Sequence, residues 1–360
     1  MGLAPSRLAR IRLETTHPPG ETEDAAFSLA GRRCHVVLNA RAGGAEDGGE
    51  TILDAIESGL RRIGATSVTI DADRSRPFEE RIRRAMASDA HLVVSAGGDG
   101  TATALATAIV DAAGDAVAHA GAGAGPQPDG GKILAVLPLC TANLLARDLQ
   151  IPLDLQEAIA ALADMQPRRI DVGRVHGRVF LHKVVIGFAP AVAAKREELR
   201  SKSDLASMTR FLRYFLSRLA KPPHRRLSLR LDDGPQEEIK VRALAIASNA
   251  YDEGLGRFFS RARLDRGHLT VYGLKHLTLA DVLRLSTGML IGRWRQDEAL
   301  SERPARSVDV AARQRRVRVM IDGEVMKLPS PLRFEIHPGA LQVLAPVEAG
   351  QASPAIEEAA

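Results

Sequence analysis

Cysteine, aromatic residues and long apolar runs are scarce in this chain, and each scarcity excludes a class of protein. The 2 cysteines, Cys34 and Cys140, stand far apart with no C-x-x-C pair, so neither a disulfide framework nor a structural zinc site is expected. The aromatic content of 4% argues against an extensive base-stacking surface, and no nucleic-acid partner is predicted. No run approaches the ~18 apolar residues that a membrane-spanning helix needs, and residues 1–30 lack the apolar centre of a secretory signal, so we expect a cytoplasmic protein.

Length and composition indicate a globular protein with two domains. The chain has 360 residues, of which 45% are hydrophobic and 26% charged, and this length exceeds the size at which one core usually stops growing. Its net charge of +5 permits attraction to anionic lipid, nucleic acid or nucleotide without choosing among them. Residues 1–30 and 347–360 mix proline, glycine and polar residues without periodicity, and both ends are predicted to be disordered.

Residues 31–150 alternate between strand-length apolar runs and helix-length segments, which predicts an α/β domain with a parallel sheet. The predicted strands are Cys34–Leu38, Ser67–Ile70, Leu92–Ser95 and Ile133–Leu137, and the predicted helices span 50–63, 77–88 and 101–113. The stretch Ala112–Gly131 is rich in alanine, glycine and proline and is interpreted as a surface insertion.

The pattern changes after the predicted boundary at Ile151-Pro152, where short alternating strands indicate an antiparallel β domain over residues 151–330. These strands are Val179–Ile186, Leu227–Leu231, Val241–Ser248, His268–Tyr272, Val308–Ala312, Val317–Ile321 and Leu332–Ile336. Helical segments interrupt them at 204–220 and 279–291, and the first is amphipathic and basic. That segment is interpreted either as a helix resting on anionic headgroups or as one packing on the β domain.

The strongest chemical signal is Gly97-Gly98-Asp99-Gly100-Thr101, which follows a predicted strand and opens a helix. Glycine lets the backbone approach an anion closely, and the first amides of a helix point at one place, so this loop is predicted to bind phosphate. The alternative is a tight strand-to-helix turn without a ligand.

The glycine loop resembles that of the catalytic domain shared by bacterial diacylglycerol kinases, sphingosine kinases and ceramide kinases. A second stretch, from Leu137 to Asn143 and followed by Ala146-Arg147, is similar to the family's Pro-Leu-Gly-Thr-x-Asn…Ala-Arg element, with Cys140 in place of glycine. The resemblance implies that the loop glycines with Asp99 and Thr101, and also Thr141 and Asn143, bind the nucleotide. Asn39, which ends the first strand, matches the family's nucleotide-contacting asparagine.

Near the C-terminus, Asp322-Gly323-Glu324 lies between alternating apolar runs and is first of all a hairpin-turn signal. The family carries the same triplet, and the resemblance implies that Asp322 is the general base and Glu324 its supporting carboxylate. Leu264-Asp265-Arg266-Gly267 is similar to a family segment that positions metal, so Asp265 is a candidate metal residue, although Arg266 replaces a second acid. A surface β-turn is the alternative there.

The resemblance as a whole implies an ATP-dependent, Mg²⁺-requiring lipid kinase that phosphorylates a diacylglycerol- or sphingosine-like lipid. It also implies that residues 151–330 form a β-sandwich lipid domain and that residues 331–346 return to the nucleotide domain. We expect the protein to bind peripherally to an anionic inner membrane surface. A homodimer is possible, and the sequence does not decide the oligomeric state. The alternatives are an NAD kinase-like enzyme for a soluble acceptor and a catalytically weak nucleotide or lipid sensor, the latter because Thr103 and Ala104 replace the family's usual Asn-Glu.

Overall fold

The computed structural model describes residues 27–39, 49–73, 75–120, 131–187, 190, 224–253, 260–275, 279–295 and 297–347. Most of the two ends predicted to be disordered, and the predicted helix at 204–220, lie outside the described residues. Among the residues that are described, no helix is both long and apolar enough to span a membrane.

The first half of the chain forms the predicted parallel sheet. Its strands are β1 (Arg33–Leu38), β2 (Ser67–Asp71), β3 (Leu92–Gly97) and β4 (Ile133–Pro138), paired in the order β2-β1-β3-β4. Every residue of β3 and β4 is buried, because helices cover both faces of a parallel sheet. This burial explains why both strands appear in the sequence as unbroken apolar runs.

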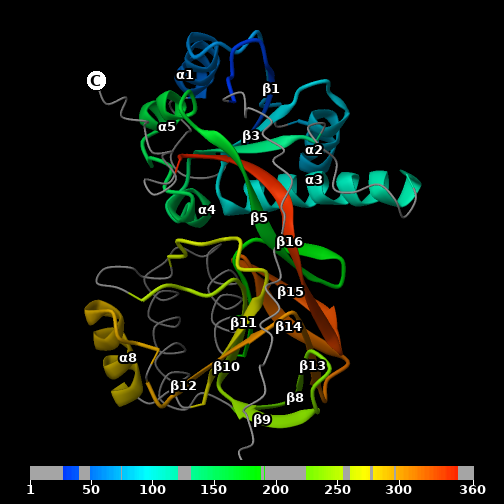
Figure 1. The fold of residues 1–360 in the computed structure, drawn as a ribbon, viewed down its shortest axis with the longest axis vertical. Coiled ribbons are helices and arrows are strands. Elements are labelled where there is room, and N and C mark those ends of the chain that lie inside the picture. The colour runs from blue at the N-terminus through cyan, green and yellow to red at the C-terminus, as the bar shows by residue number, and fades with distance from the viewer. Residues whose placement is uncertain are drawn as a thin grey trace, which may run out of the picture.

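Five helices accompany these strands in the upper part of Figure 1. Helix α1 (Gly49–Arg62) packs against α5 (Leu155–Ala161), whereas α2 (Phe78–Ala87) packs against α3 (Asp99–Ala120), and α4 (Leu144–Asp148) follows β4. The interpretation of Ala112–Gly131 as an insertion is wrong for its first part, because α3 continues to Ala120. Alanine is the best helix former, so an alanine-rich stretch extends a helix that has already begun. Residues 121–130 lie outside the described part.

One sheet continues from the parallel strands into the second half of the chain. The long strand β16 (Leu332–Ala345) lies parallel to β4 near one end and antiparallel to β13 (Ser307–Ala312) near the other. It pairs along much of its length with β5 (Gln166–Val175), and the two strands cross together between the upper and lower parts of Figure 1. The sheet then continues through β8 (Arg225–Leu231) and β9 (Glu237–Val241), and β6 (Arg178–Phe180) pairs with β5.

A second, antiparallel sheet faces this extension and completes a β-sandwich. Its order is β12-β11-β10-β7-β14-β15, and helix α8 (Leu279–Ile291) lies at its side in Figure 1. The strands are β7 (Lys183–Gly187), β10 (Ala243–Ser248), β11 (Leu269–Leu274), β12 (Leu300–Ala305), β14 (Arg316–Ile321) and β15 (Glu324–Pro329). Buried side chains of both sheets, such as Leu229, Ile246 and Phe334, form one core between them. The predicted fold class, an α/β domain followed by an antiparallel β-sandwich, is confirmed.

Several strands differ from their predicted limits for local reasons. The run Val179–Ile186 is not one strand but two, β6 and β7, because the chain bends at residues 181 and 182. Strand β12 includes Pro304 and shows no clear alternation, so its sequence gave no strand signal; proline is tolerated because β12 is an edge strand. The domain limits at Ile151-Pro152 and residue 331 stay predictions.

Candidate active site

The glycine loop connects β3 to α3 in a tight turn. The N–H groups of Thr101 and Ala102 both donate to the carbonyl oxygen of Gly98, at 2.9 and 3.2 Å. A side chain at Gly97 would lie 2.7 Å from Oγ1 of Thr101, so this position requires glycine. Among the described residues, no backbone carbonyl accepts the N–H of Gly98 or Gly100. These amides and the positive end of α3 therefore remain available to an anion.

Asn39 joins the end of β1 to the glycine loop. Its Nδ2 donates to Oγ1 of Thr101 at 3.2 Å, and its N–H donates to the carbonyl of Ala96 at 2.9 Å. Thr101 is buried, so its hydroxyl acts here as an internal acceptor. The structure thus brings two predicted nucleotide residues together at the carboxyl edge of the sheet, where open α/β sheets bind ligands.

Asp99 and Asn143 join the loop after β4 to the same edge. Oδ1 of Asp99 accepts the N–H of Leu145, in the first turn of α4, at 3.1 Å. Asn143 adopts a left-handed φ of 45°, and its Oδ1 accepts the N–H of Cys140 at 3.1 Å. Thr141 is exposed. The three loops that follow β1, β3 and β4 are therefore connected by side chains that the sequence had singled out.

Cys140 lies directly against the glycine loop. A side chain at Gly98 would come within 2.5 Å of Sγ of Cys140, so the thiol already fills the space beside Gly98. Burial, together with the charge of Asp99, raises the pKa of the Cys140 thiol and keeps it protonated. The cysteine that replaces the family glycine therefore adds bulk to the loop, and it adds no charge.

Asp322 occupies a two-residue turn between β14 and β15 and also reaches the other half of the molecule. Ile321 pairs with Glu324, and Asp322 and Gly323 both have positive φ angles, 44° and 97°, as a tight hairpin turn requires. Oδ2 of Asp322 accepts the hydroxyl of Thr103, in the first turns of α3, at 3.2 Å. The hairpin-turn interpretation is therefore confirmed, and the side chain of Asp322 also contacts α3, whereas its role as general base stays a prediction.

Three backbone amides hold the Asp322 carboxylate. The N–H of Leu181 donates to Oδ2 at 2.7 Å, and the N–H groups of His182 and Lys183 donate to Oδ1 at 3.0 and 2.9 Å. Burial raises the pKa of Asp322, and these three donors oppose that shift because they favour the charged form. They also explain the bend between β6 and β7, since amides bound to a carboxylate are not available to a strand ladder. Glu324 is exposed and has no hydrogen bond to a described residue, so its supporting role stays a prediction.

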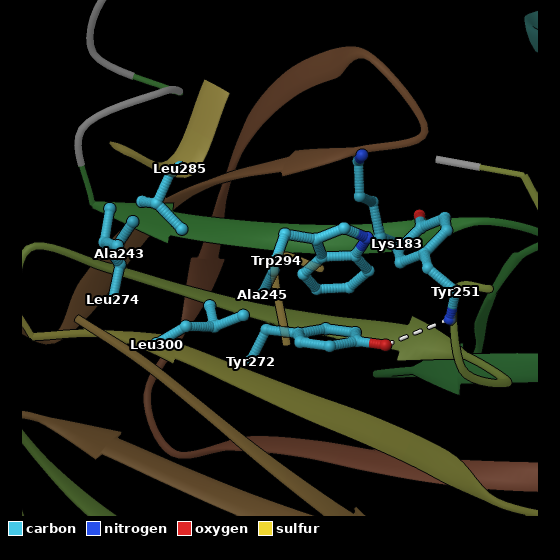
Figure 2. A pocket seen from close by; sticks show the side chains of 9 residues that line it. All are labelled: Lys183, Ala243, Ala245, Tyr251, Tyr272, Leu274, Leu285, Trp294 and Leu300. Atoms are coloured by element: carbon cyan, nitrogen blue, oxygen red, sulfur yellow. Dashed lines mark hydrogen bonds between the residues drawn. The ribbon is translucent and has the colours of Figure 1, made fainter. Parts of the chain in front are cut away.

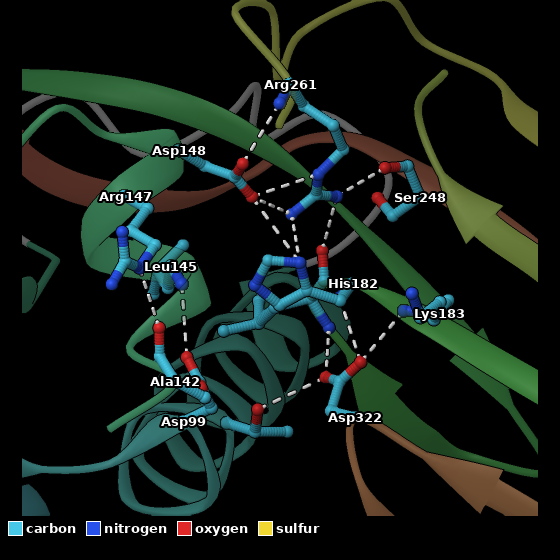
Figure 3. A network of polar contacts seen from close by, with 12 residues as sticks. Asp99, Ala142, Leu145, Arg147, Asp148, His182, Lys183, Ser248, Arg261 and Asp322 are labelled. Atoms are coloured by element: carbon cyan, nitrogen blue, oxygen red, sulfur yellow. Dashed lines mark hydrogen bonds and ion pairs between the residues drawn. The ribbon is translucent and has the colours of Figure 1, made fainter. Parts of the chain in front are cut away.

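A buried ion pair that the sequence did not indicate lies beside Asp322 (Figure 3). Arg261 is 1% exposed, and its Nε and Nη2 donate to Oδ2 of Asp148 at 3.0 and 2.6 Å. Nη1 of Arg261 donates to the carbonyl oxygens of Leu181 and Ser248, at 2.8 and 2.5 Å. Because Asp148 ends α4 and Leu181 precedes β7, Arg261 connects the helix after β4 to the segment that holds Asp322.

His182 completes this network as a neutral imidazole. Nη2 of Arg261 lies 2.8 Å from Nδ1 of His182, and a guanidinium can only donate, so Nδ1 is the acceptor and the ring proton is on Nε2. Burial, followed by the charge of Arg261, lowers the pKa of His182 well below its ordinary value. The histidine is therefore uncharged at neutral pH.

An apolar cavity of about 200 Å³ begins at Lys183, the residue after His182. Figure 2 shows Lys183 and Tyr251 at one end of this cavity, Tyr272 and Trp294 along it, and Ala243 and Leu274 at the other end. Nζ of Lys183 lies 5.1 Å from the centre of the Tyr251 ring. Burial and then the charge of Arg261 lower the pKa of Lys183 to about 8, although Asp322 and Asp148 oppose the shift. The cavity is thus apolar along its walls and has Lys183 at one end. The backbone N–H of Lys183 donates to the Asp322 carboxylate.

Asp265 is bonded by its neighbour Arg263 and has no hydrogen bond to the network of Asp148, Arg261 and Asp322 among the described residues. Nε of Arg263 donates to its Oδ1 at 3.0 Å, and this hydrogen bond lowers the pKa of Asp265. Arg266 pairs with Asp252 at 3.0 Å, and the buried carboxylate of Asp171 holds the turn by accepting the N–H of Gly267 at 2.6 Å. No cluster of three or more potential metal ligands occurs among the described residues. The metal role of Asp265 stays a prediction.

The residues that the sequence missed share one property. Asp148, Asp171, His182, Lys183 and Arg261 belong to no motif that was recognised, and each acts through partners far away in the chain. A charged residue between apolar residues is a signal that could have identified Asp171, which lies between Ile170 and Val172 in β5.

Comparison with known proteins assigns both halves of the chain. The diacylglycerol kinase catalytic domain matches residues 33–175, and the YegS C-terminal NAD kinase beta sandwich-like domain matches residues 182–345. A crystal structure of a diacylglycerol kinase from Bacillus anthracis has the same fold, with a TM-score of 0.63 at 19% identity, over 87% of this chain and 97% of that one.

Curated relatives agree with this assignment. A probable lipid kinase, YegS-like, from Pseudomonas aeruginosa is 30% identical over 316 residues, which are 86% of this chain and 93% of the relative. A diacylglycerol kinase from Staphylococcus haemolyticus is 22% identical over 303 residues, which are 83% of this chain and 84% of the relative. The chain therefore belongs to the YegS-like lipid kinases with a diacylglycerol kinase catalytic domain, which are phosphotransferases acting on an alcohol group.

Proposed function

We propose that this protein transfers the γ-phosphate of ATP to a hydroxyl of a diacylglycerol- or sphingosine-like lipid at a membrane surface. The observation that carries the proposal is the contact between Thr103, just inside the helix that opens at the glycine loop, and Asp322, on the sandwich. A predicted phosphate-binding loop and a half-buried carboxylate thereby meet beside an apolar cavity.

The glycine loop supplies the phosphate-binding part of this site. The amides of Gly98 and Gly100 and the positive end of α3 suit the phosphates of a nucleotide, and Asn39 and Asn143 fix the neighbouring loops. Mg²⁺ usually binds through one or two carboxylates together with the nucleotide phosphates, so it does not require a cluster of protein ligands. Asp99 is the carboxylate of the loop itself, and it would hold the ion that neutralises charge on the phosphates.

Asp322 supplies the acceptor part. Its carboxylate accepts the proton of the lipid hydroxyl while the hydroxyl oxygen bonds to the γ-phosphorus and the bond to the leaving ADP oxygen breaks. The products are ADP and a lipid phosphate. The hydroxyl of Thr103 already bonds to Oδ2 of Asp322 at 3.2 Å, which is longer than the three amide contacts. This contact marks the direction from which an acceptor hydroxyl approaches.

The apolar cavity favours a lipid over a soluble acceptor such as NAD. Its walls are alanine, leucine and aromatic side chains, with Lys183 the charged group at one end. Burying each methylene of an acyl chain contributes roughly 0.8 kcal/mol, whereas a dinucleotide would leave polar groups unpaired there. The cavity therefore suits a hydrocarbon chain whose hydroxyl end points toward Asp322.

A transfer experiment tests the proposal. Purified protein receives γ-labelled ATP, Mg²⁺ and a panel of lipids in mixed micelles, with NAD as the soluble acceptor. We expect label in a lipid that carries a free hydroxyl. Label in NAD alone would favour the soluble-acceptor alternative, and nucleotide binding without transfer to any acceptor would favour a sensor.

A further inference from the structure

A second cavity, of about 600 Å³, is lined by residues of both sheets and is rich in positive charge. Strands β7, β8, β13 and β14 all contribute to its walls. The cationic side chains that line it include Arg225, Arg226, Arg313, Arg316, Arg318 and Lys327, and the described lining residues include no aspartate or glutamate. We call this group of six residues the basic cavity.

Two cross-strand pairs of like charges involve residues of the basic cavity, and three of their four members line it. Arg318 pairs with Lys327 across β14 and β15, and Arg226 pairs with Lys240 across β8 and β9. All four side chains are exposed, and none forms an ion pair with an acidic side chain of the described chain. Like charges directly opposite on a sheet are destabilising. A bound anion would offset this repulsion.

The basic cavity is separate from the phosphoryl-transfer site. Arg316 begins β14, and Asp322 follows directly after its end, six residues later, whereas Arg318 lies four residues before Asp322. A strand rises about 3.4 Å per residue, so the backbone of Arg316 lies on the order of 20 Å from Asp322 and that of Arg318 about 14 Å. The hydrogen bonds of the Asp322 carboxylate go to Thr103, Leu181, His182 and Lys183, and none of these residues belongs to the basic cavity.

The basic cavity and the apolar cavity nevertheless meet at one strand pair. Gly187 of β7 lines the basic cavity, and its partner Ala243 of β10 lines the far end of the apolar cavity. The apolar cavity extends from there to Lys183 (Figure 2), whose backbone N–H donates to Asp322. An anionic surface bound at the basic cavity would thus lie next to the end of the apolar cavity that is remote from the carboxylate.

We propose that the basic cavity binds the phosphate headgroups of anionic phospholipids, and that it holds this end of the sandwich against the membrane so that a lipid enters the apolar cavity from there. The choice of a membrane over another polyanion rests on the proposed lipid kinase function. The charge of the cavity and its separation from Asp322 do not depend on that function.

Vesicle binding of a charge-removing variant tests the proposal. Arg318→Gln with Lys327→Gln removes one like-charge pair, and each basic residue near an anionic surface contributes roughly fivefold to binding, so the double variant should bind phosphatidylglycerol-containing vesicles about 25-fold more weakly. Arg230→Gln with Arg303→Gln removes the same charge from the same sandwich, but these arginines pair with Asp309 and Glu237. This control should bind nearly as well as the wild type. Arg318→Lys with Lys327→Arg keeps both charges and should also bind.

The melting temperature separates an anion site from an internal ion-pair network. If the cations repel one another, Arg318→Gln with Lys327→Gln should melt at a higher temperature than the wild type at low salt. A lower melting temperature together with unchanged vesicle binding would overturn the proposal, because the cations would then be paired with acidic residues of this chain.

Two further arms identify the source of the anion. Inorganic phosphate and double-stranded DNA are each tested as competitors of phosphatidylglycerol vesicles at equal phosphate concentration. Competition by either one would overturn the membrane assignment. Transfer to a short-chain acceptor dissolved as a monomer should be the same in wild type and variant. If neither the wild type nor the variant transfers phosphate to this acceptor, the proposed kinase function is contradicted. The membrane-binding proposal is not affected by that result, because vesicle binding is measured without ATP.

Discussion

Thr103 and Asp322 are 219 residues apart in the sequence, and the hydroxyl of one bonds to the carboxylate of the other at 3.2 Å. This single contact joins the helix that opens at the glycine loop to the hairpin turn of the sandwich. The contact also bears on the sensor alternative, because Thr103 is one of the two residues that replace the family's usual Asn-Glu after the glycine loop. A residue that suggested lost activity is therefore in direct contact with Asp322.

Gly98 and Cys140 should behave as a coupled pair. A methyl group added by Gly98→Ala would lie 2.5 Å from Sγ of Cys140, so we expect this variant to displace the loop and to weaken ATP binding at least tenfold. Cys140→Gly removes the obstacle, and the double variant should recover most of the affinity. Calorimetric titration of the three variants gives the coupling energy, and additive effects would contradict the packing described here.

The buried ion pair of Arg261 and Asp148 should dominate local stability. Arg261→Met leaves the Asp148 carboxylate buried without its partner, and breaking such a pair typically costs about 3–5 kcal/mol of unfolding free energy. Arg303→Met, which removes an exposed pair with Glu237, is the matched control and should cost at most about 1 kcal/mol. Urea denaturation measures both, and equal losses would mean that burial of Arg261 has no special consequence.

His182 should make the protein less stable as the pH falls. Its pKa in the folded protein lies well below the ordinary 6.5, so below about pH 6.5 the unfolded chain binds a proton that the folded protein does not. Its contribution is therefore present above that pH and is lost progressively below it. His182→Asn keeps an acceptor for Arg261 but cannot be protonated, and its melting temperature should decline less between pH 7 and 5 than that of the wild type. Parallel curves would exclude His182 as the cause, since His35 and His337 remain in both proteins.

The apolar cavity should select the length of the acceptor chain. Ala245 lines the cavity on β10, and Ala245→Phe would fill part of its volume of about 200 Å³. We expect KM to rise at least tenfold for a long-chain lipid and little for a short-chain analogue, with ATP affinity unchanged, because the loss is confined to methylene burial. Steady-state kinetics on a series of chain lengths distinguishes this from a general loss of activity, which would affect all lengths alike.

Local patterns were sufficient to predict the parallel half of the fold and the glycine loop. The strand at 92–95 and the glycines after it are adjacent in the sequence, so their arrangement follows from short-range chemistry. The Asp322 turn was recognised for the same reason, from Asp-Gly between two alternating runs. The position of its carboxylate depends on Leu181, His182 and Lys183, whose amides donate to it where β6 ends and β7 begins.

The buried network of Asp148, His182 and Arg261 could not be predicted from the sequence, because its members are brought together by contacts between residues far apart in the chain. Arg261 appears in the sequence as one of several arginines near a loop, and nothing local distinguishes it from Arg263. In the structure Arg261 is 1% exposed, whereas Arg263 is exposed and pairs with Asp265. Only the packing of α4 against the start of β7 decides which arginine is enclosed.

Asp322→Asn tests the central claim, and the structure provides a matched control for it. Asparagine cannot accept hydrogen bonds at both positions that the three amides occupy, so we expect a loss of about 1–3 kcal/mol in stability besides any chemical effect. Asp171→Asn makes the same change in a buried carboxylate that accepts the N–H groups of Gly267 and Gly339 away from the Thr103 contact. The control therefore reproduces the structural loss alone.

The decisive measurement is the rate of phosphate transfer to lipid per folded molecule, in both variants and the wild type, at a temperature where all three are folded. If Asp322 is the general base, Asp322→Asn should transfer about 10²–10⁴-fold more slowly at unchanged ATP affinity, whereas Asp171→Asn should stay within a few-fold of the wild type. Wild-type transfer by folded Asp322→Asn, or an equal loss in Asp171→Asn, would contradict the account and leave Asp322 a structural residue only.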